Sequence, residues 1–104
     1  MDELEACRPL AEGETLHAGH PEWPLFSVTI HGSARERIKL SKRLVCAVKH
    51  LPLRLRIAYE KDVARSLERG VAKDPTLEMD GRILAEGLVP AEKLTEIFEH
   101  LLLQ

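Results

Sequence analysis

The sequence predicts a single α/β domain whose elements follow the order β-α-β-α-β-β-α. Residues 25–30 (LFSVTI) alternate apolar and polar side chains, as a half-buried strand does. Residues 77–87 (LEMDGRILAEG) hold two short apolar runs around Asp80-Gly81, a pair that favours a tight type I′ hairpin turn. Amphipathic helical patterns separate the strands and follow the hairpin. These observations place the chain in the α/β class.

The first helix is expected from Ala34 to about His50, where Pro52 ends it. Ser33 is a favourable N-cap, and Glu36 three positions later would complete a capping box. The apolar residues cover about half of the helical wheel. They are Ile38, Leu40, Leu44, Val45, Ala47, Val48 and Leu51.

Residues 53–59 (LRLRIAY) are predicted as the second strand. A helix connects it to the first strand, so we expect the two strands to be parallel, with a right-handed crossover. The next helix is expected at about residues 60–69, with Gly70 as its C′ residue. Pro90 is predicted as the first residue of the last helix. One face of that helix carries Leu94, Ile97, Phe98, Leu101 and Leu102.

Residues 1–24 have a different character, because proline and glycine are frequent there and no period is sustained. We expect an N-terminal arm over residues 1–24 and the domain over residues 25–104. A short helix over residues 2–10 would be ended by Pro9. Trp23 is expected to pack the arm onto the domain, while Trp23 and Phe26 together offer an alternative, self-association as a homodimer.

The composition is that of an ordinary folded domain. The chain has 104 residues, 44% apolar and 31% charged, with a formal net charge of −2. This charge gives no reason to expect nucleic acid as a partner, and no apolar run approaches the roughly 20 residues of a membrane helix. The first ten residues lack the features of a secretory signal, and two cysteines are too few for a disulfide scaffold. We therefore expect a reduced, cytoplasmic protein without membrane insertion.

Four short segments occur in order along the C-terminal half: Gly70-Val71, Asp74-Pro75-Thr76-Leu77, Asp80-Gly81 and Gly87-Leu88-Val89-Pro90. In order and spacing they resemble small bacterial and archaeal thioredoxin-like proteins, also called redox-active disulfide proteins. The resemblance covers about residues 25–103. It implies the minimal thioredoxin or glutaredoxin fold, with a mixed four-stranded sheet flanked by helices. It also implies a cis peptide bond before Pro75, beside a groove that can pair with an extended peptide.

The chain departs from this family at the start of the first helix. The resemblance aligns the two positions of the Cys-x-x-Cys motif with Ala34 and Arg37. Dithiol exchange needs a thiolate nucleophile and a second, resolving thiol. Alanine and arginine provide neither, so we expect no dithiol catalysis, no catalytic residues and no cofactor.

The favoured hypothesis is a non-catalytic module that binds a peptide or protein. Arg35 and Arg37 provide positive charge and Asp74 negative charge, which favours an extended peptide of mixed charge. The backbone N–H groups at the start of the first helix offer an alternative, the binding of a carboxylate or phosphate. The predicted groove consists of Gly32, Ser33, Ala34, Arg35, Arg37, Asp74, Pro75 and Thr76.

The alternative hypothesis is a redox protein that acts through one cysteine, Cys46 or Cys7. Lysines at helical spacings around Cys46 could activate its thiol. Cys7, His17 and His20 do not match the closed ligand sets of structural zinc, so no metal is expected. His31 has no nucleophile or partner nearby in the sequence, and we interpret it as a polar residue at a strand end.

Overall fold

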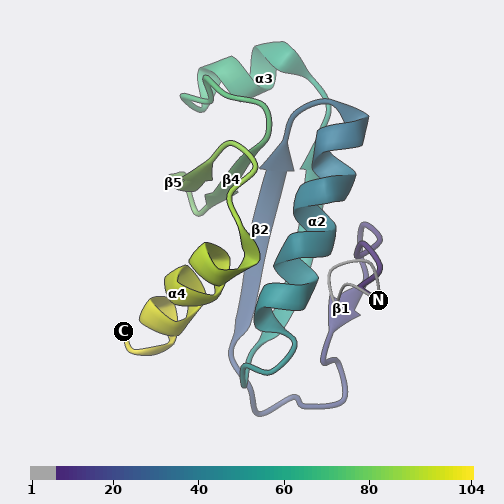
Figure 1. Cartoon of the computed structure of the whole chain (residues 1–104), viewed down its shortest axis with the longest axis vertical. Coiled ribbons are helices and arrows are strands. Elements are labelled where there is room, and N and C mark those ends of the chain that lie inside the picture. Colours follow the sequence, from purple (N-terminus) through teal and green to yellow (C-terminus); the bar gives the residue numbers. More distant parts are fainter. Residues whose placement is uncertain (1–6) are drawn as a thin grey trace.

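The computed structural model describes residues 7–104 as an α/β fold built on one mixed sheet. The strands are β1 (Thr15–Leu16), β2 (Leu25–His31), β3 (Arg54–Glu60), β4 (Thr76–Met79) and β5 (Arg82–Glu86). The helices are α2 (Ala34–Val48), α3 (Val63–Glu68) and α4 (Ala91–Leu102). The strands lie side by side in the order β1-β3-β2-β4-β5 (Figure 1).

The sheet confirms the predicted strand directions. β2 and β3 are parallel and paired from Leu25↔Arg54 to His31↔Glu60. β4 runs antiparallel to β2 and forms a hairpin with β5. At the hairpin turn Asp80 has φ 51° and Gly81 has φ 78°, the positive angles that a type I′ turn requires. The sheet has five strands rather than four, because β1 of the arm pairs with β3.

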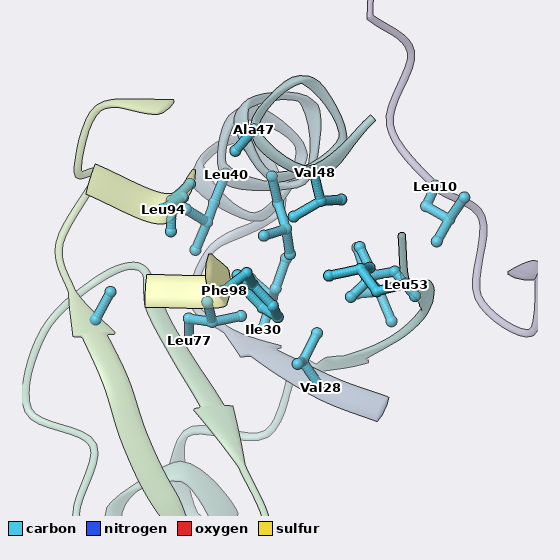
Figure 2. Close-up of a cluster of buried hydrophobic side chains, with 14 of the residues drawn as sticks. Leu10, Val28, Ile30, Leu40, Ala47, Val48, Leu53, Leu77, Leu94 and Phe98 are labelled. Carbon is cyan, nitrogen blue, oxygen red and sulfur yellow. The ribbon is translucent and has the colours of Figure 1, made fainter. Parts of the chain in front are cut away.

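The hydrophobic core lies between one face of the sheet and the helices α2 and α4, which pack together on that face (Figure 1). Side chains alternate along a strand, so Val28 and Ile30 of β2 point to the same side. Figure 2 shows Ile30 beneath α2 and beside Phe98 of α4. Burial of these apolar side chains is the main stabilising contribution to the fold.

The buried face of α2 differs at two positions from the predicted apolar face. Ile38 was expected inside but is 48% exposed, whereas Ser41 is fully buried. The arm accounts for the burial of Ser41, because the backbone N–H of Leu10 donates to Ser41 Oγ over 3.0 Å and Leu10 joins the core. The arm covers a part of α2 that the sequence pattern assigns to solvent.

The arm is therefore part of the folded domain. The structure joins Cys7 to Cys46 in a disulfide, a pairing that we did not expect from two cysteines. The short helix expected over residues 2–10 falls largely on residues 1–6, outside the described residues, and residues 7–10 have no regular structure.

The two aromatic residues proposed for self-association both contact their own chain. Trp23 stacks on His20 with ring centroids 3.8 Å apart, and its carbonyl accepts a hydrogen bond from Arg54 Nε. Phe26 packs edge-on against Phe98 at 5.8 Å. Among the described residues, no helix is long and apolar enough to cross a membrane.

Helix α3 lies past the C-terminal end of β2 (Figure 1) and is fixed at both ends by hydrogen bonds. The carboxylate of Asp62 accepts from the N–H groups of Ala64 and Arg65, which makes Asp62 the N-cap. Gly70 has φ 81° and is the C′ residue, as predicted. Val71 N–H donates to Ser66 C=O over 3.0 Å, the long bond of a Schellman motif. At the start of α4, Pro90 is the N-cap rather than the predicted first helical residue.

Candidate functional site

The start of α2 meets the loop before β4. The Asp74-Pro75 bond is cis, as the sequence resemblance implied. Ser33 N–H donates to Asp74 Oδ1 over 3.0 Å, which ties the two loops together. Gly32 has φ 139°, and a Cβ added there would lie 2.1 Å from Asp74 Oδ1. Only glycine fits this approach, because any side chain would displace the Asp74 carboxylate.

A pocket of about 530 Å³ opens between these loops and α3. One side is apolar and includes Val63 and Leu67, which are 72% and 64% exposed. The other side carries charge of both signs. The pocket is lined by His31, Gly32, Ser33, Ala34, Arg37, Glu60, Lys61, Val63, Ser66, Leu67, Val71, Ala72, Lys73 and Asp74.

Five residues of the predicted groove line this pocket: Gly32, Ser33, Ala34, Arg37 and Asp74. The other three predicted residues lie outside the lining. Arg35 is exposed on α2, whereas Pro75 and Thr76 are buried. The hydroxyl of Thr76 donates to Lys73 C=O over 2.7 Å, so Thr76 stabilises the Asp74 loop without lining the pocket.

The predicted capping box is wrong. Ser33 occupies the N-cap position of α2, but its side chain makes no cap hydrogen bond. In a capping box the residue at N3 accepts from the N-cap N–H. Here that N–H donates to Asp74, and Glu36 pairs with Lys39 at 3.5 Å instead. The expected contact between Ser33 and Glu36 is thus replaced by a contact between Ser33 and Asp74 of the loop before β4.

His31 at the end of β2 forms the centre of a buried polar cluster. Its side chain is fully buried, with Nδ1 2.7 Å from Ser66 Oγ and Nε2 2.7 Å from Glu78 Oε1. His31 is the last residue of β2, as the interpretation of a polar strand end had it, but the structure adds two partners that the sequence analysis did not consider. Both partners are distant in sequence, since Ser66 is on α3 and Glu78 is on β4.

The fold brings these three residues together in a simple way. His31 pairs with Thr76 across β2 and β4, and Glu78 lies two residues further along β4. Residues two apart on a strand share a face, so His31 and Glu78 are diagonal neighbours on the face opposite α2 and α4. The hydrogen bonds at both ends of α3 position Ser66 next to His31. His31 and Glu78 each occupy a strand position that alternates with the buried apolar residues, so the sequence could have predicted that they share the other face. Nothing in the sequence indicated Ser66.

The charge state of the cluster follows from the contacts of Glu78. Burial by itself would raise the pKa of this carboxyl, but hydrogen bonds from His31 and Arg69 prevail and lower it below its usual value. Arg69 Nη1 lies 3.2 Å from both carboxylate oxygens, and Gly81 N–H donates to Oε2 at the same distance. Glu78 is thus a carboxylate that accepts from His31 Nε2–H. In the tautomer with its single proton on Nε2, the ring accepts the hydroxyl proton of Ser66 at Nδ1.

The remaining candidate residues lie elsewhere. Cys7 and Cys46 are in the disulfide at the far side of α2, so neither is a free thiol in this structure. His17 Nδ1 donates to Leu53 C=O over 2.8 Å, and His20 Nδ1 lies 3.3 Å from Glu22. Within residues 7–104, no three histidine, cysteine or acidic side chains are grouped as metal ligands would be.

The comparisons with known proteins return no relative: no family model, no curated protein and no solved structure matches the chain. The candidate site consists of three parts. A charged edge is formed by the start of α2 and the Asp74 loop, an apolar edge is formed by α3, and the cluster around His31 lies on the floor between them.

Proposed function

We propose that this chain is a thioredoxin-like domain that binds an extended segment of a partner protein and performs no dithiol exchange. The observation that carries the proposal is the pocket of about 530 Å³ in which two exposed apolar side chains of α3 face charged groups of α2 and the Asp74 loop. Exposed apolar groups beside polar ones are typical of binding sites.

The thioredoxin-like assignment is supported by the connectivity of residues 25–104. A parallel pair, β2 and β3, is followed by the antiparallel strands β4 and β5. The cis peptide bond of Asp74-Pro75 faces the start of α2, as in the family that the sequence resembles. Ala34 and Arg37 stand at the positions of the missing thiols, which supports a function without dithiol chemistry.

The lining indicates which segment would bind. Val63 and Leu67 would contact an apolar side chain of the partner. Lys61 and Lys73 would attract acidic groups, while Glu60 would attract a basic one. The best occupant is therefore an extended peptide with an apolar residue between charges of both signs. Charged contacts on the rim act mainly on the association rate and weaken with salt.

The alternative of a single-cysteine redox protein requires an extra step, because Cys7 and Cys46 are bonded to each other. A reductant would have to open the disulfide before either thiol could react. A cytoplasmic location remains part of our proposal, with the pair reduced there, since that compartment keeps thiols reduced.

The test uses peptides selected from a random display library and then measured singly by fluorescence anisotropy. Val63→Asp with Leu67→Asp should weaken binding by about tenfold or more, because it places charge in the apolar half of the pocket. Leu103→Asp is the matched control, since Leu103 is 85% exposed at the end of α4 and lies outside the pocket.

A second pair of variants tests the charged edge. Arg37→Glu reverses a charge within the pocket, whereas Arg35→Glu reverses one on the exposed side of the same helix turn. We expect Arg37→Glu to reduce binding more than Arg35→Glu.

The apolar variants supply the outcome that would contradict the proposed function. That outcome is the selection of the same peptides by the wild type and by Val63→Asp with Leu67→Asp.

A further inference from the structure

A hydroxyl and a base at the floor of the pocket form one hydrogen-bonded chain with a carboxylate outside its lining. Ser66 Oγ lies 2.7 Å from His31 Nδ1, and His31 Nε2 lies 2.7 Å from Glu78 Oε1. Both distances fall within the range expected for a nucleophile beside its general base and for a base beside its orienting acid. The peptide-binding proposal uses none of these contacts.

The environment of each group matches one role in acyl transfer. Glu78 is buried and ionised, so it fixes the imidazole with its proton on Nε2. The role of base requires an unprotonated Nδ1, which in that tautomer accepts the hydroxyl proton of Ser66. Ser66 and His31 both border the pocket, where Ser66 is 9% exposed and His31 is fully buried. The helix cap and the Schellman motif hold Ser66 in place from both ends of α3.

We infer that Ser66, His31 and Glu78 form a serine acyl-transfer site that hydrolyses small esters of apolar acids. This goes beyond the peptide-binding proposal and does not depend on it. Ser66 is the nucleophile and His31 the general base, and Glu78 is a positioning residue that acts through His31. The apolar acyl group would lie against Leu67 and Val71.

The reaction balances without a metal or an oxidant. The hydroxyl proton of Ser66 moves to His31 Nδ1 while Oγ bonds to the acyl carbon. The carbon–oxygen bond to the leaving alcohol then breaks, and the alcohol takes the proton from His31. Water then gives a proton to His31 Nδ1 and bonds to the acyl carbon, the bond to Ser66 Oγ breaks, and Oγ takes the proton back as the acid is released.

The opposite edge of the pocket can stabilise the negative charge that develops on the acyl oxygen. The N-terminus of α2 carries partial positive charge and is not capped by the Ser33 side chain, while the Asp74 carboxylate occupies only the N–H of Ser33. Arg37, Lys61 and Lys73 line the same pocket. Positive groups already placed near a developing oxyanion lower the barrier to acyl transfer.

The first experiment exposes the full chain to an alkyl fluorophosphonate, which bonds phosphorus to an activated serine and releases fluoride. Peptide mapping by mass spectrometry should place the adduct on Ser66. Ser66→Ala should lose the adduct, and Ser27→Ala, which removes an exposed serine of β2, should retain it. A folded wild-type protein that stays unlabelled, or equal labelling of Ser66→Ala, would overturn the inference.

The second experiment separates catalysis from structure by following p-nitrophenyl butyrate hydrolysis and labelling rate against pH. Glu78→Gln should lower both rates by about tenfold or more and move the pH profile to lower pH, because the protonated ring loses its carboxylate. Ser66→Cys should regain an acyl adduct at position 66. If circular dichroism shows that the variants are folded and the profile of Glu78→Gln matches the wild type, Glu78 does not act through His31. Neither probe is a peptide, so failure here leaves the proposed function intact.

Discussion

Helices α2 and α3 are held in the same fold by different forces. α2 has 15 residues and buries four apolar side chains, those of Leu40, Leu44, Ala47 and Val48. α3 has six residues, of which only Ser66 is buried, and its apolar Val63 and Leu67 face the solvent. α2 is therefore stabilised by hydrophobic burial, whereas α3 is positioned by its caps and by His31.

This difference separates stability from the candidate site. A helix of six residues has little intrinsic stability in water, so its hydrogen bonds at both ends matter. Because α3 contributes no apolar side chain to the core, Val63 and Leu67 are left to line the pocket. Changes in α2 should therefore affect folding, and changes in α3 should affect the site.

The same substitution in both helices gives the sharpest comparison. Leu44→Ala should destabilise the fold by about 2–5 kcal/mol, because Leu44 is fully buried and its loss leaves a cavity. Leu67→Ala should change stability by less than about 0.5 kcal/mol, because Leu67 is mostly exposed. Urea denaturation of both variants measures the difference. Equal losses would show that α3 is part of the core.

The disulfide stabilises the α2 side of the molecule. Cys7 and Cys46 are 39 residues apart, and closing a loop of that length restricts the unfolded chain. Removing both thiols by Cys7→Ser with Cys46→Ser should cost about 2–4 kcal/mol, while Ser66 should still react with the fluorophosphonate. Wild-type protein treated with reductant should unfold like the double variant. Identical denaturation curves with and without reductant would show that the bond adds nothing.

Glu78, which contacts α3 through His31 and Ser66, should make the free energy of unfolding depend on pH in acid. Its pKa is lowered in the folded state, so its contribution is complete above the usual glutamate pKa of about 4.3. That contribution is lost as the pH falls through the lower, folded-state value. Glu78→Gln should cost about 1–3 kcal/mol at neutral pH by weakening buried hydrogen bonds.

The same variant should also flatten the loss of stability in acid, which denaturation at several pH values would measure. Glu99→Gln is the control, because Glu99 is exposed on α4. If Glu78→Gln kept the full acid response of the wild type, another carboxyl would be responsible.

The smallest effects concern the two helix caps. Asp62→Ala should cost about 1 kcal/mol, because the Asp62 carboxylate accepts from two backbone N–H groups of α3. Ser33→Ala should change stability by only a few tenths of a kcal/mol, about the size of a surface substitution, since the Ser33 hydroxyl caps nothing. Thermal denaturation of both variants measures which substitution lowers the stability more. A larger loss of stability from Ser33→Ala than from Asp62→Ala would indicate that Ser33 does cap α2, as the sequence predicted.

The sequence predicted most of the secondary structure because those signals are local. The strand at Leu25–His31 ends within one residue of its predicted limit, and α2 ends two residues before its expected end. The hairpin turn at Asp80-Gly81 and the C′ role of Gly70 are both confirmed by their positive φ angles. Each depends on the conformational preferences of a few neighbouring residues.

The candidate site was predictable only in part. The pairing of the Asp74 loop with the start of α2 came from the resemblance and agrees with the contact from Ser33 N–H to Asp74. The capping box failed because it is a local rule, and here a carboxylate from another loop takes the same N–H. The burial of Ser41 was missed because the arm was taken to lie outside the core.

By itself the sequence determined the order of the strands and helices from residue 25 onward and their limits to within a few residues, since hydrophobic period, proline and glycine act over short distances. It also determined that no Cys-x-x-Cys pair stands at the start of α2. The tertiary structure alone decided that His31 contacts Ser66 and Glu78, and that Cys7 meets Cys46. These contacts join residues 35 to 47 positions apart. The register of β2 against β4, the docking of α3 and the path of the arm determine them, and no local preference encodes such distances.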